Sequence, residues 1–147
     1  MAPIPTILEV EARPIAVVRR RAMVRELSTV VPAACGEVWE LARAHHVVSP
    51  GRLVALYLDE TINFEVGVEV GDDFEGVPGL ARSETPAGRV ATVAHLGPYS
   101  GLFEAHQAIR AHCRQHGHTQ TVPNWEIYGH WTDDPAQLRT DVFYLLK

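Results

Sequence analysis

Glu126, Tyr128 and His130 stand at alternate positions in the run NWEIYGHW, residues 124–131. Successive side chains of a β-strand point to opposite faces, so these three polar side chains would share one face. The other face would carry Trp125, Ile127, Gly129 and Trp131. A carboxylate taken out of water costs several kcal/mol unless another group compensates it, so a buried Glu126 would attract a cation. The alternative is that this face is ordinary solvated surface.

Aromatic side chains elsewhere in the chain can complete a receptor around this carboxylate. Each ring that faces a bound cation adds ~0.5 to 2 kcal/mol of cation–π attraction. Tyr57, Tyr99 and Tyr128 supply such rings, and Trp39 falls just beside the apolar side of its predicted helix. Should these rings and the carboxylate share one site, that site would attract a cation.

The histidines leave two interpretations open. His106 lies on the apolar side of a predicted helix, where it is either a hydrogen-bonded core residue or a pocket residue that contacts a ligand. His112 and His116 stand four residues apart and could meet one metal ion. No acidic residue accompanies them as in H-E-x-x-H, and the end of a helix favours histidine by itself. We therefore expect no metal and no cofactor.

The elements of the first half must form part of the sheet that holds the 124–131 run. They are predicted, in chain order, as an extended segment, a helix and two strands, at 6–23, 32–46, 52–60 and 63–71. Pro14 predicts a break or an edge position in the extended segment, and Pro32 suits the first turn of the helix. The acidic, Pro- and Gly-containing residues 72–88 are typical of a linker.

The second half repeats this order. Its predicted elements are a strand, a helix and two strands, at 89–96, about 98–117, 124–131 and 139–147. Since one helix and three strands cannot cover their own sheet, we expect an α+β fold in which two repeats, about 6–71 and 79–147, pack into a single domain. Matching the halves pairs Tyr57 with Tyr128 and Ala55 with Glu126, so the tyrosine recurs and the carboxylate does not. The tryptophan face of the 124–131 strand is expected to pack against a helix.

The run HLGPYSGLFEAHQAI, a helix ending in HG and a strand with P-x-W-E-I-Y follow one another in the second half. This combination resembles the GyrI-like small-molecule-binding domain, a family that includes effector-binding domains of multidrug-responsive transcription regulators. The resemblance implies two strand–helix–strand–strand modules related by a pseudo-twofold axis, an antiparallel sheet, and a central ligand cleft on its concave surface. It places Glu126 at the cleft floor beside Tyr128. His106 departs from the family pattern, which often has an aromatic residue there.

Three functions follow from these observations. The first is binding of a bulky aromatic small molecule, charged or neutral, by Glu126, Tyr128, Tyr57, Tyr99, Trp39 and His106. The second comes from the resemblance: some members look like hydrolases that open cyclopropane-bearing genotoxins, and Glu126 and Tyr128 would then be catalytic, with the glutamate transferring the proton and a tyrosine binding the oxyanion. The third is a module that inhibits a protein partner.

Size, charge and composition exclude other classes. The 147 residues fit one compact domain. The formal net charge is -5, whereas nucleic-acid binders show a basic face, so we expect no direct nucleic-acid contact. No apolar run approaches the ~20 residues that span a bilayer, and the opening residues lack signal-peptide features, so a cytoplasmic protein without a membrane partner is expected. Cys35 and Cys113 are predicted to be reduced core thiols.

Overall fold

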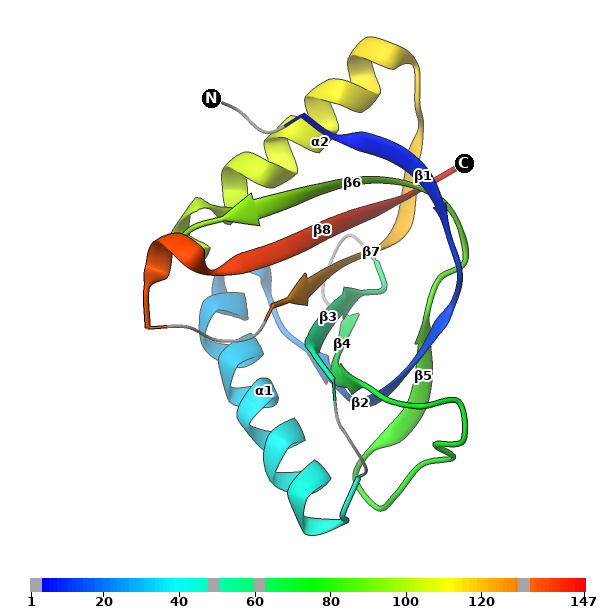
Figure 1. Ribbon diagram of the computed structural model, residues 1–147, viewed down its shortest axis with the longest axis vertical. Coiled ribbons are helices and arrows are strands. Elements are labelled where there is room, and N and C mark those ends of the chain that lie inside the picture. Colours follow the sequence, from blue (N-terminus) through cyan, green and yellow to red (C-terminus); the bar gives the residue numbers. More distant parts are fainter. Residues whose placement is uncertain (1–3, 48–50, 60–62, 130–132) are drawn as a thin grey trace.

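The computed structural model describes residues 4–47, 51–59, 63–129 and 133–147. Within these residues it contains one antiparallel sheet and two α-helices, which confirms the α+β class (Figure 1). The strands are β1 (Thr6–Val10), β2 (Arg13–Arg21), β3 (Leu53–Tyr57), β4 (Asn63–Glu69), β5 (Ala81–Thr85), β6 (Gly88–Leu96), β7 (Gln120–Tyr128) and β8 (Arg139–Leu146). The helices are α1 (Leu27–Ala44) and α2 (Leu102–His116), with short 3-10 turns η1 (Val24–Glu26), η2 (Tyr99–Gly101) and η3 (Pro135–Gln137).

The strands follow the order β1-β6-β8-β7-β3-β4-β2-β5 across the sheet. Its centre is the β3–β7 pair, in which Ala55 lies directly opposite Glu126. Outward from this pair, the strands of the first half follow in the order β3, β4, β2. Those of the second half follow in the corresponding order β7, β8, β6. The pseudo-twofold axis and the division into repeats at 6–71 and 79–147 stay predictions.

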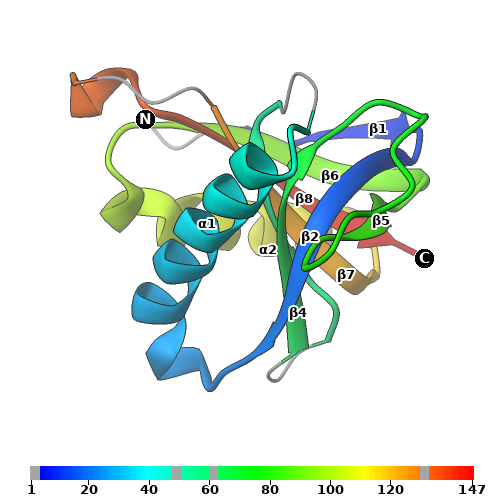
Figure 2. The same ribbon diagram turned by 90° about the horizontal axis from the view of Figure 1, so that it is seen from below.

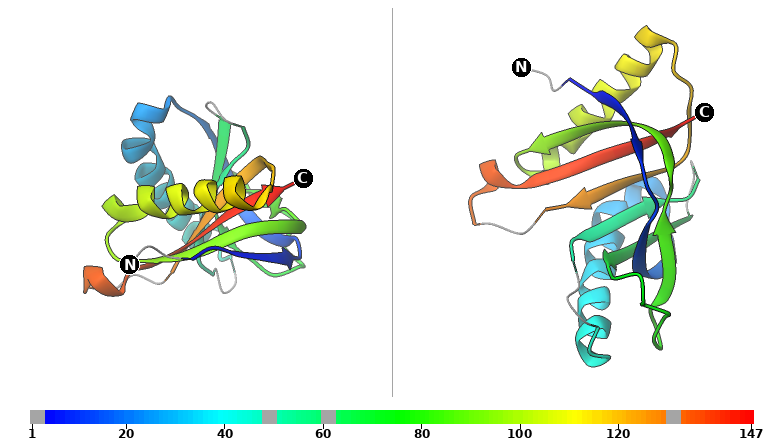
Figure 3. Two further views of the ribbon diagram at one scale, coloured as in Figure 1. Left: turned by 90° about the horizontal axis from the view of Figure 1, so that it is seen from above. Right: turned by 45° about the vertical axis from the view of Figure 1, so that its right-hand side comes forward.

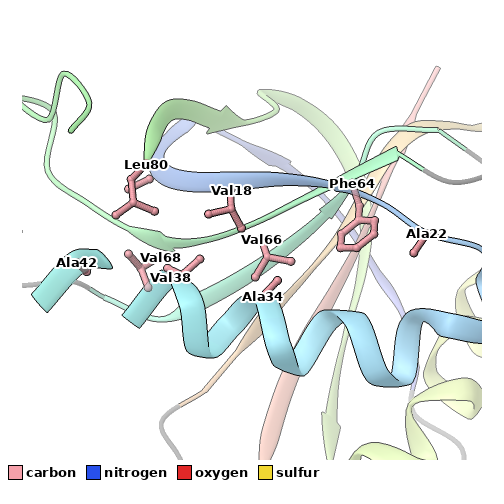
Figure 4. Packing of buried hydrophobic residues seen from close by; sticks show 10 residues of the cluster. Val18, Ala22, Ala34, Val38, Ala42, Phe64, Val66, Val68 and Leu80 are labelled. Carbon is pink, nitrogen blue, oxygen red and sulfur yellow. The ribbon is translucent and has the colours of Figure 1, made fainter. Parts of the chain in front are cut away.

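Both helices cover the same face of the sheet. Paired residues form a row across five strands on this face: Val66, Ala55, Glu126, Val142 and Val93. Helix α1 packs Ala34, Val38 and Ala42 against β2 and β4, where Phe64 and Val66 are buried (Figure 4). Helix α2 packs on β6 and β8 through its buried residues Ala105, Ile109 and Cys113. Figures 2 and 3 show the two helices on one side of the strands.

The opposite face of the sheet has a core made by strands. Trp125 and Ile127 of β7 are buried there with residues of β2, β3 and β6, and Trp125 stacks on Phe143 with ring centroids 5.1 Å apart. The alternation predicted for this run is confirmed, but the expected helix on the tryptophan side is wrong, because both helices lie on the Glu126 side. His130 and Trp131 lie outside the described residues.

Several element boundaries differ from prediction. Helix α1 begins at Leu27, so Pro32 lies inside it. Proline removes a single backbone hydrogen bond there, and the extra turn lets Leu27 and Val30 pack on the core. The extended segment breaks between Val10 and Arg13, and β1 and β2 then join distant strands, β6 and β4.

The predicted linker at 72–88 contains the edge strand β5, which pairs with β2. Ser83 of β5 donates a hydrogen bond to the buried carboxylate of Glu65 at 2.6 Å, and Arg19 of β2 pairs with the other oxygen at 2.6 Å. The bond from Ser83 links β5 to β4 and, with the backbone pairing to β2, holds a strand without apolar alternation in the sheet. Among the helices that the structure describes, none has both the length and the apolar character needed to cross a bilayer.

Candidate functional site

A pocket of about 750 Å³ lies between α1 and the central strands. Residues from both halves of the chain line it, contributed by α1, β3, the η2 turn and the end of β7. Arg52 is the only charged residue among the described residues that line it, and its guanidinium is held by Glu69 at 2.8 Å and lies 3.7 Å from Asp141. The pocket wall is therefore mainly apolar and aromatic.

Helix α1 presents two apolar stripes, and one of them faces the pocket. Leu27, Val31, Cys35 and Trp39 recur at four-residue steps and all line the pocket. Cys35, predicted to be a core thiol, is partly buried: it packs against the core beneath this helix and also lines the pocket. Burial raises the pKa of the Cys35 thiol to about 11, so the thiol is neutral at pH 7. The four-residue spacing was the sequence signal that could have found Leu27 and Val31.

Three tyrosines form the opposite wall. Tyr57 ends β3, Tyr128 ends β7, and Tyr99 begins the η2 turn after Pro98. The rings of Tyr99 and Tyr128 meet edge to face, with centroids 5.8 Å apart. The structure therefore brings together four of the six predicted ligand-binding residues: Trp39, Tyr57, Tyr99 and Tyr128.

Glu126 lies behind these tyrosines and is not among the residues that line the pocket. Its side chain is buried, with 6% of the residue exposed. Tyr128 donates a hydrogen bond to Oε1 of Glu126 at 2.6 Å, and Tyr57 donates a longer one to the same oxygen at 3.4 Å. The carboxylate is thus connected to the pocket by hydrogen bonds from two tyrosines that line it.

His106 of α2 contacts the other side of the carboxylate. Its Nε2 lies 2.8 Å from Oε2 of Glu126, and its Nδ1 lies 2.6 Å from the hydroxyl of Tyr144 in β8. Arg110, one turn further along α2, donates to the same Tyr144 oxygen at 3.4 Å. The position of His106 on the apolar side of α2 was predicted, whereas Tyr144 and Arg110 carried no signal, because their contacts depend on how α2 lies on the sheet.

Burial and hydrogen bonding have opposing effects on the ionisation of this cluster. Burial alone would raise the pKa of Glu126, but the hydrogen bond and charge of His106, together with the two tyrosine hydroxyls, outweigh burial and hold that pKa below its usual value. Burial and the nearby Glu126 carboxylate raise the pKa of Tyr57, and they raise that of Tyr128 strongly. Glu126 is therefore ionised at pH 7 and both tyrosines remain hydrogen-bond donors.

The α2 histidines were considered as possible ligands of one metal ion. His112 and His116 have ring centroids 4.3 Å apart at the end of α2. No group of three or more His, Cys, Asp or Glu side chains in the described part of the chain is placed to hold an ion. Both cysteines are free, as predicted; Cys113 is buried in the core and Cys35 is partly buried at the pocket.

Comparison with solved structures shows the same fold in several proteins. The EcmrR C-terminal domain matches with a TM-score of 0.78 and 18% identity, covering 100% of this chain and 99% of that one. SAV2435 bound to tetraphenylphosphonium matches with a TM-score of 0.72 and 8% identity over 97% and 93% of the two chains. A hydrolase from Listeria innocua matches with a TM-score of 0.65 and 10% identity over 98% and 92%. Comparison with curated protein sequences finds no match.

The family model of the GyrI-like small molecule binding domain matches residues 4–147, which is nearly the whole chain. This match agrees with the resemblance carried by the GPY and E-x-Y motifs. It also agrees with the pocket, whose lining comes from both halves of the domain. The chain belongs to the GyrI-like small-molecule-binding domain family.

Proposed function

We propose that this protein binds a bulky aromatic small molecule, with a preference for a cation, in the pocket between α1 and the central strands. One observation carries the proposal: two tyrosines of an apolar, aromatic pocket donate hydrogen bonds to one buried, ionised carboxylate. The same chemistry fits the tetraphenylphosphonium in the structure of SAV2435.

The hydrogen bonds explain how a carboxylate behind the wall can act on a ligand in front of it. A tyrosine that donates its proton toward Glu126 gains electron density on its ring. The ring face then attracts a cation more strongly, and cation–π contacts are worth about 2 kcal/mol or more when they are desolvated. Trp39 supplies the best cation–π ring on the other side of the pocket.

Tetraphenylphosphonium and tetraphenylborate give a matched test, because they share size and shape and differ in the sign of their charge. Isothermal titration calorimetry at pH 7 is expected to show tighter binding of the phosphonium. Glu126→Gln keeps the shape and the acceptor oxygen but removes the charge. It should weaken the phosphonium by about tenfold, equivalent to ~1.4 kcal/mol, and should not weaken the borate.

Glu104→Gln is the control, since Glu104 is an exposed carboxylate on the first turn of α2. It makes the same change in net charge without touching the tyrosines. If Glu104→Gln and Glu126→Gln weaken the phosphonium equally, the effect comes from the general field of the protein and the proposed role of Glu126 is wrong. If neither ion binds the wild-type protein, the proposed ligand class is wrong.

Hydrolysis of a cyclopropane-bearing compound is the second candidate. The observation that favours it is the continuous set of hydrogen bonds from Tyr128 in the pocket wall through Glu126 to His106. Water would form a C–O bond to a ring carbon as the neighbouring ring bond breaks, and the electrons of the broken bond would pass to a conjugated carbonyl. Tyr128, whose hydroxyl has one proton, would turn that proton from Glu126 to the resulting enolate oxygen. The proton of the attacking water would pass through the Tyr57 hydroxyl to Glu126, and protonation of the enolate carbon would complete the addition of one water.

Mass spectrometry tests this candidate directly. Incubation with a carbonyl-conjugated cyclopropane should give a product heavier by one water, faster than in buffer. Tyr128→Phe should abolish the excess rate, whereas Tyr99→Phe leaves the hydrogen-bonded set intact and should retain most of it. A rate equal to that in buffer would leave binding as the function. Inhibition of a protein partner, absence of direct nucleic-acid contact and a cytoplasmic location stay predictions.

A further inference from the structure

We propose that His106 sets the charge preference of the pocket, because it balances the carboxylate of Glu126 from the side away from the ligand. This inference rests on the proposed binding function and names the residue that tunes it. Protonated His106 would make the buried pair neutral, and the pocket would then distinguish little between a cation and an uncharged ligand. Neutral His106 would leave one negative charge behind the tyrosines, and the pocket would prefer a cation.

The two oxygens of Glu126 divide the cluster into a pocket side and a helix side. Oε1 accepts from Tyr128 and Tyr57, whose rings line the pocket, and Oε2 is 2.8 Å from Nε2 of His106. His106 is not itself among the lining residues. A ligand in the pocket therefore feels the charge of the pair without touching the histidine.

Both charge states of His106 can keep their hydrogen bonds. In each state Nε2 carries the proton and donates to Glu126. Neutral His106 accepts at Nδ1 from the Tyr144 hydroxyl, while the protonated ring donates from Nδ1 to the same oxygen, 2.6 Å away. Arg110 also donates to the Tyr144 oxygen, at 3.4 Å, and its positive charge opposes the attraction of Glu126 for a protonated ring. The histidine is thus held between opposing charges.

The ionisable groups around His106 come from each element packed near it. They are Glu126 and Tyr128 of β7, Tyr144 of β8, Arg110 of α2 itself and, beyond Glu126, Tyr57 of β3. The β6 residues packed against α2, Ala91 and Val93, are apolar. Hydrogen bonds hold the pKa of Glu126 below its usual value and burial raises the pKa of each of these tyrosines, so none of them changes charge around neutrality.

The experiment measures the ratio of dissociation constants for tetraphenylborate and tetraphenylphosphonium by calorimetry, from about pH 5.5 to about pH 9, a range in which histidine ordinarily titrates. In the wild-type protein the ratio should rise by about tenfold toward high pH, the effect of one partly screened charge. In His106→Gln it should be high at every pH. The control His116→Gln, an exposed residue near the end of the same helix, should keep the wild-type rise.

A role of His106 in folding alone would give a different result. Loss of folding would weaken the binding of both ions together. The proposal instead requires His106→Gln to strengthen binding of the phosphonium at low pH and Glu126→Gln to weaken binding of the phosphonium. The wild-type pH series needs no substitution, so it can overturn the inference even if His106→Gln fails to fold. If both ions bind with a ratio that does not change with pH, the inference is wrong and the proposed function survives. If neither ion binds, the proposed function is what fails.

Discussion

The Oε1 atom of Glu126 accepts hydrogen bonds from two tyrosines at unequal distances, 2.6 Å from Tyr128 and 3.4 Å from Tyr57. A short bond to a charged acceptor is strong, and removing its donor leaves the buried carboxylate poorly satisfied. Tyr128→Phe should therefore lower the free energy of unfolding by ~1.5 to 3 kcal/mol, and Tyr57→Phe by less than about 1 kcal/mol. Urea unfolding followed by circular dichroism at pH 7 measures both. Equal losses would mean that the two hydroxyls hold the carboxylate equally.

The pKa of Glu126 lies below its usual value in the folded protein, and this fixes the sign of a pH effect. The ionised form stabilises the fold at pH values above the unfolded pKa of about 4.3, and this contribution is lost as the pH falls through the lower folded pKa. Wild-type stability should therefore drop in acid more steeply than that of Glu126→Gln. Parallel urea midpoints for the two proteins, from neutral pH down to about pH 3, would contradict the lowered pKa.

At the scale of elements, the packing of β4 against β2 depends on a residue without a side chain. A Cβ atom on Gly67 would lie 2.2 Å from the backbone oxygen of Ala16 and 2.7 Å from Cγ1 of Val17. Gly67→Ala should therefore lower the free energy of unfolding by ~1 to 3 kcal/mol or more, because the backbone must move to make room for the added methyl group. Gly36→Ala is the matched control, because nothing lies within 4 Å of its new Cβ on α1 and helix propensity favours alanine by ~1 kcal/mol. Thermal unfolding should shift in opposite directions for the two variants.

How far the sequence predicts these elements depends on where their stability comes from. Period-two alternation placed Trp125 and Glu126 on opposite faces, because each face of β7 is buried against different neighbours. Strand β5 was missed, since an edge strand held by Ser83 and Thr85 needs no apolar alternation. The start of α1 was predicted too late, because proline was taken as the first turn although tertiary packing holds an earlier one.

The site shows the same limit. Four pocket residues followed from residue type and spacing, but the place of Glu126 behind the tyrosines did not. That place depends on α2 packing on β6 and β8, so that His106 and Tyr144 fill the space on the far side of the carboxylate. Contacts between elements far apart in sequence carry no periodic signal, and only the assembled sheet defines them.

At the scale of the whole molecule, the two halves are joined by more than their central strands. Strand β1 of the first half completes the second half by pairing with β6, and β5 completes the first half by pairing with β2 (Figure 1). Leu80, which belongs to the predicted second repeat, is buried in the core between α1 and the sheet of the first half (Figure 4). Each half therefore lacks strands that the other half supplies.

This exchange predicts that neither half folds alone. Fragments 1–75 and 76–147, cut in an exposed loop, would separate three strand pairings: β1–β6, β2–β5 and β3–β7. Each fragment alone should give a poorly dispersed NMR spectrum and bind no tetraphenylphosphonium. Its edge strands would be unpaired and its core residues exposed, and a half-size core buries too little apolar surface to make folding favourable. An equimolar mixture should recover both the dispersion and the binding, since the pocket takes residues from both fragments. A dispersed spectrum from either fragment by itself would show that the halves are independent folding units.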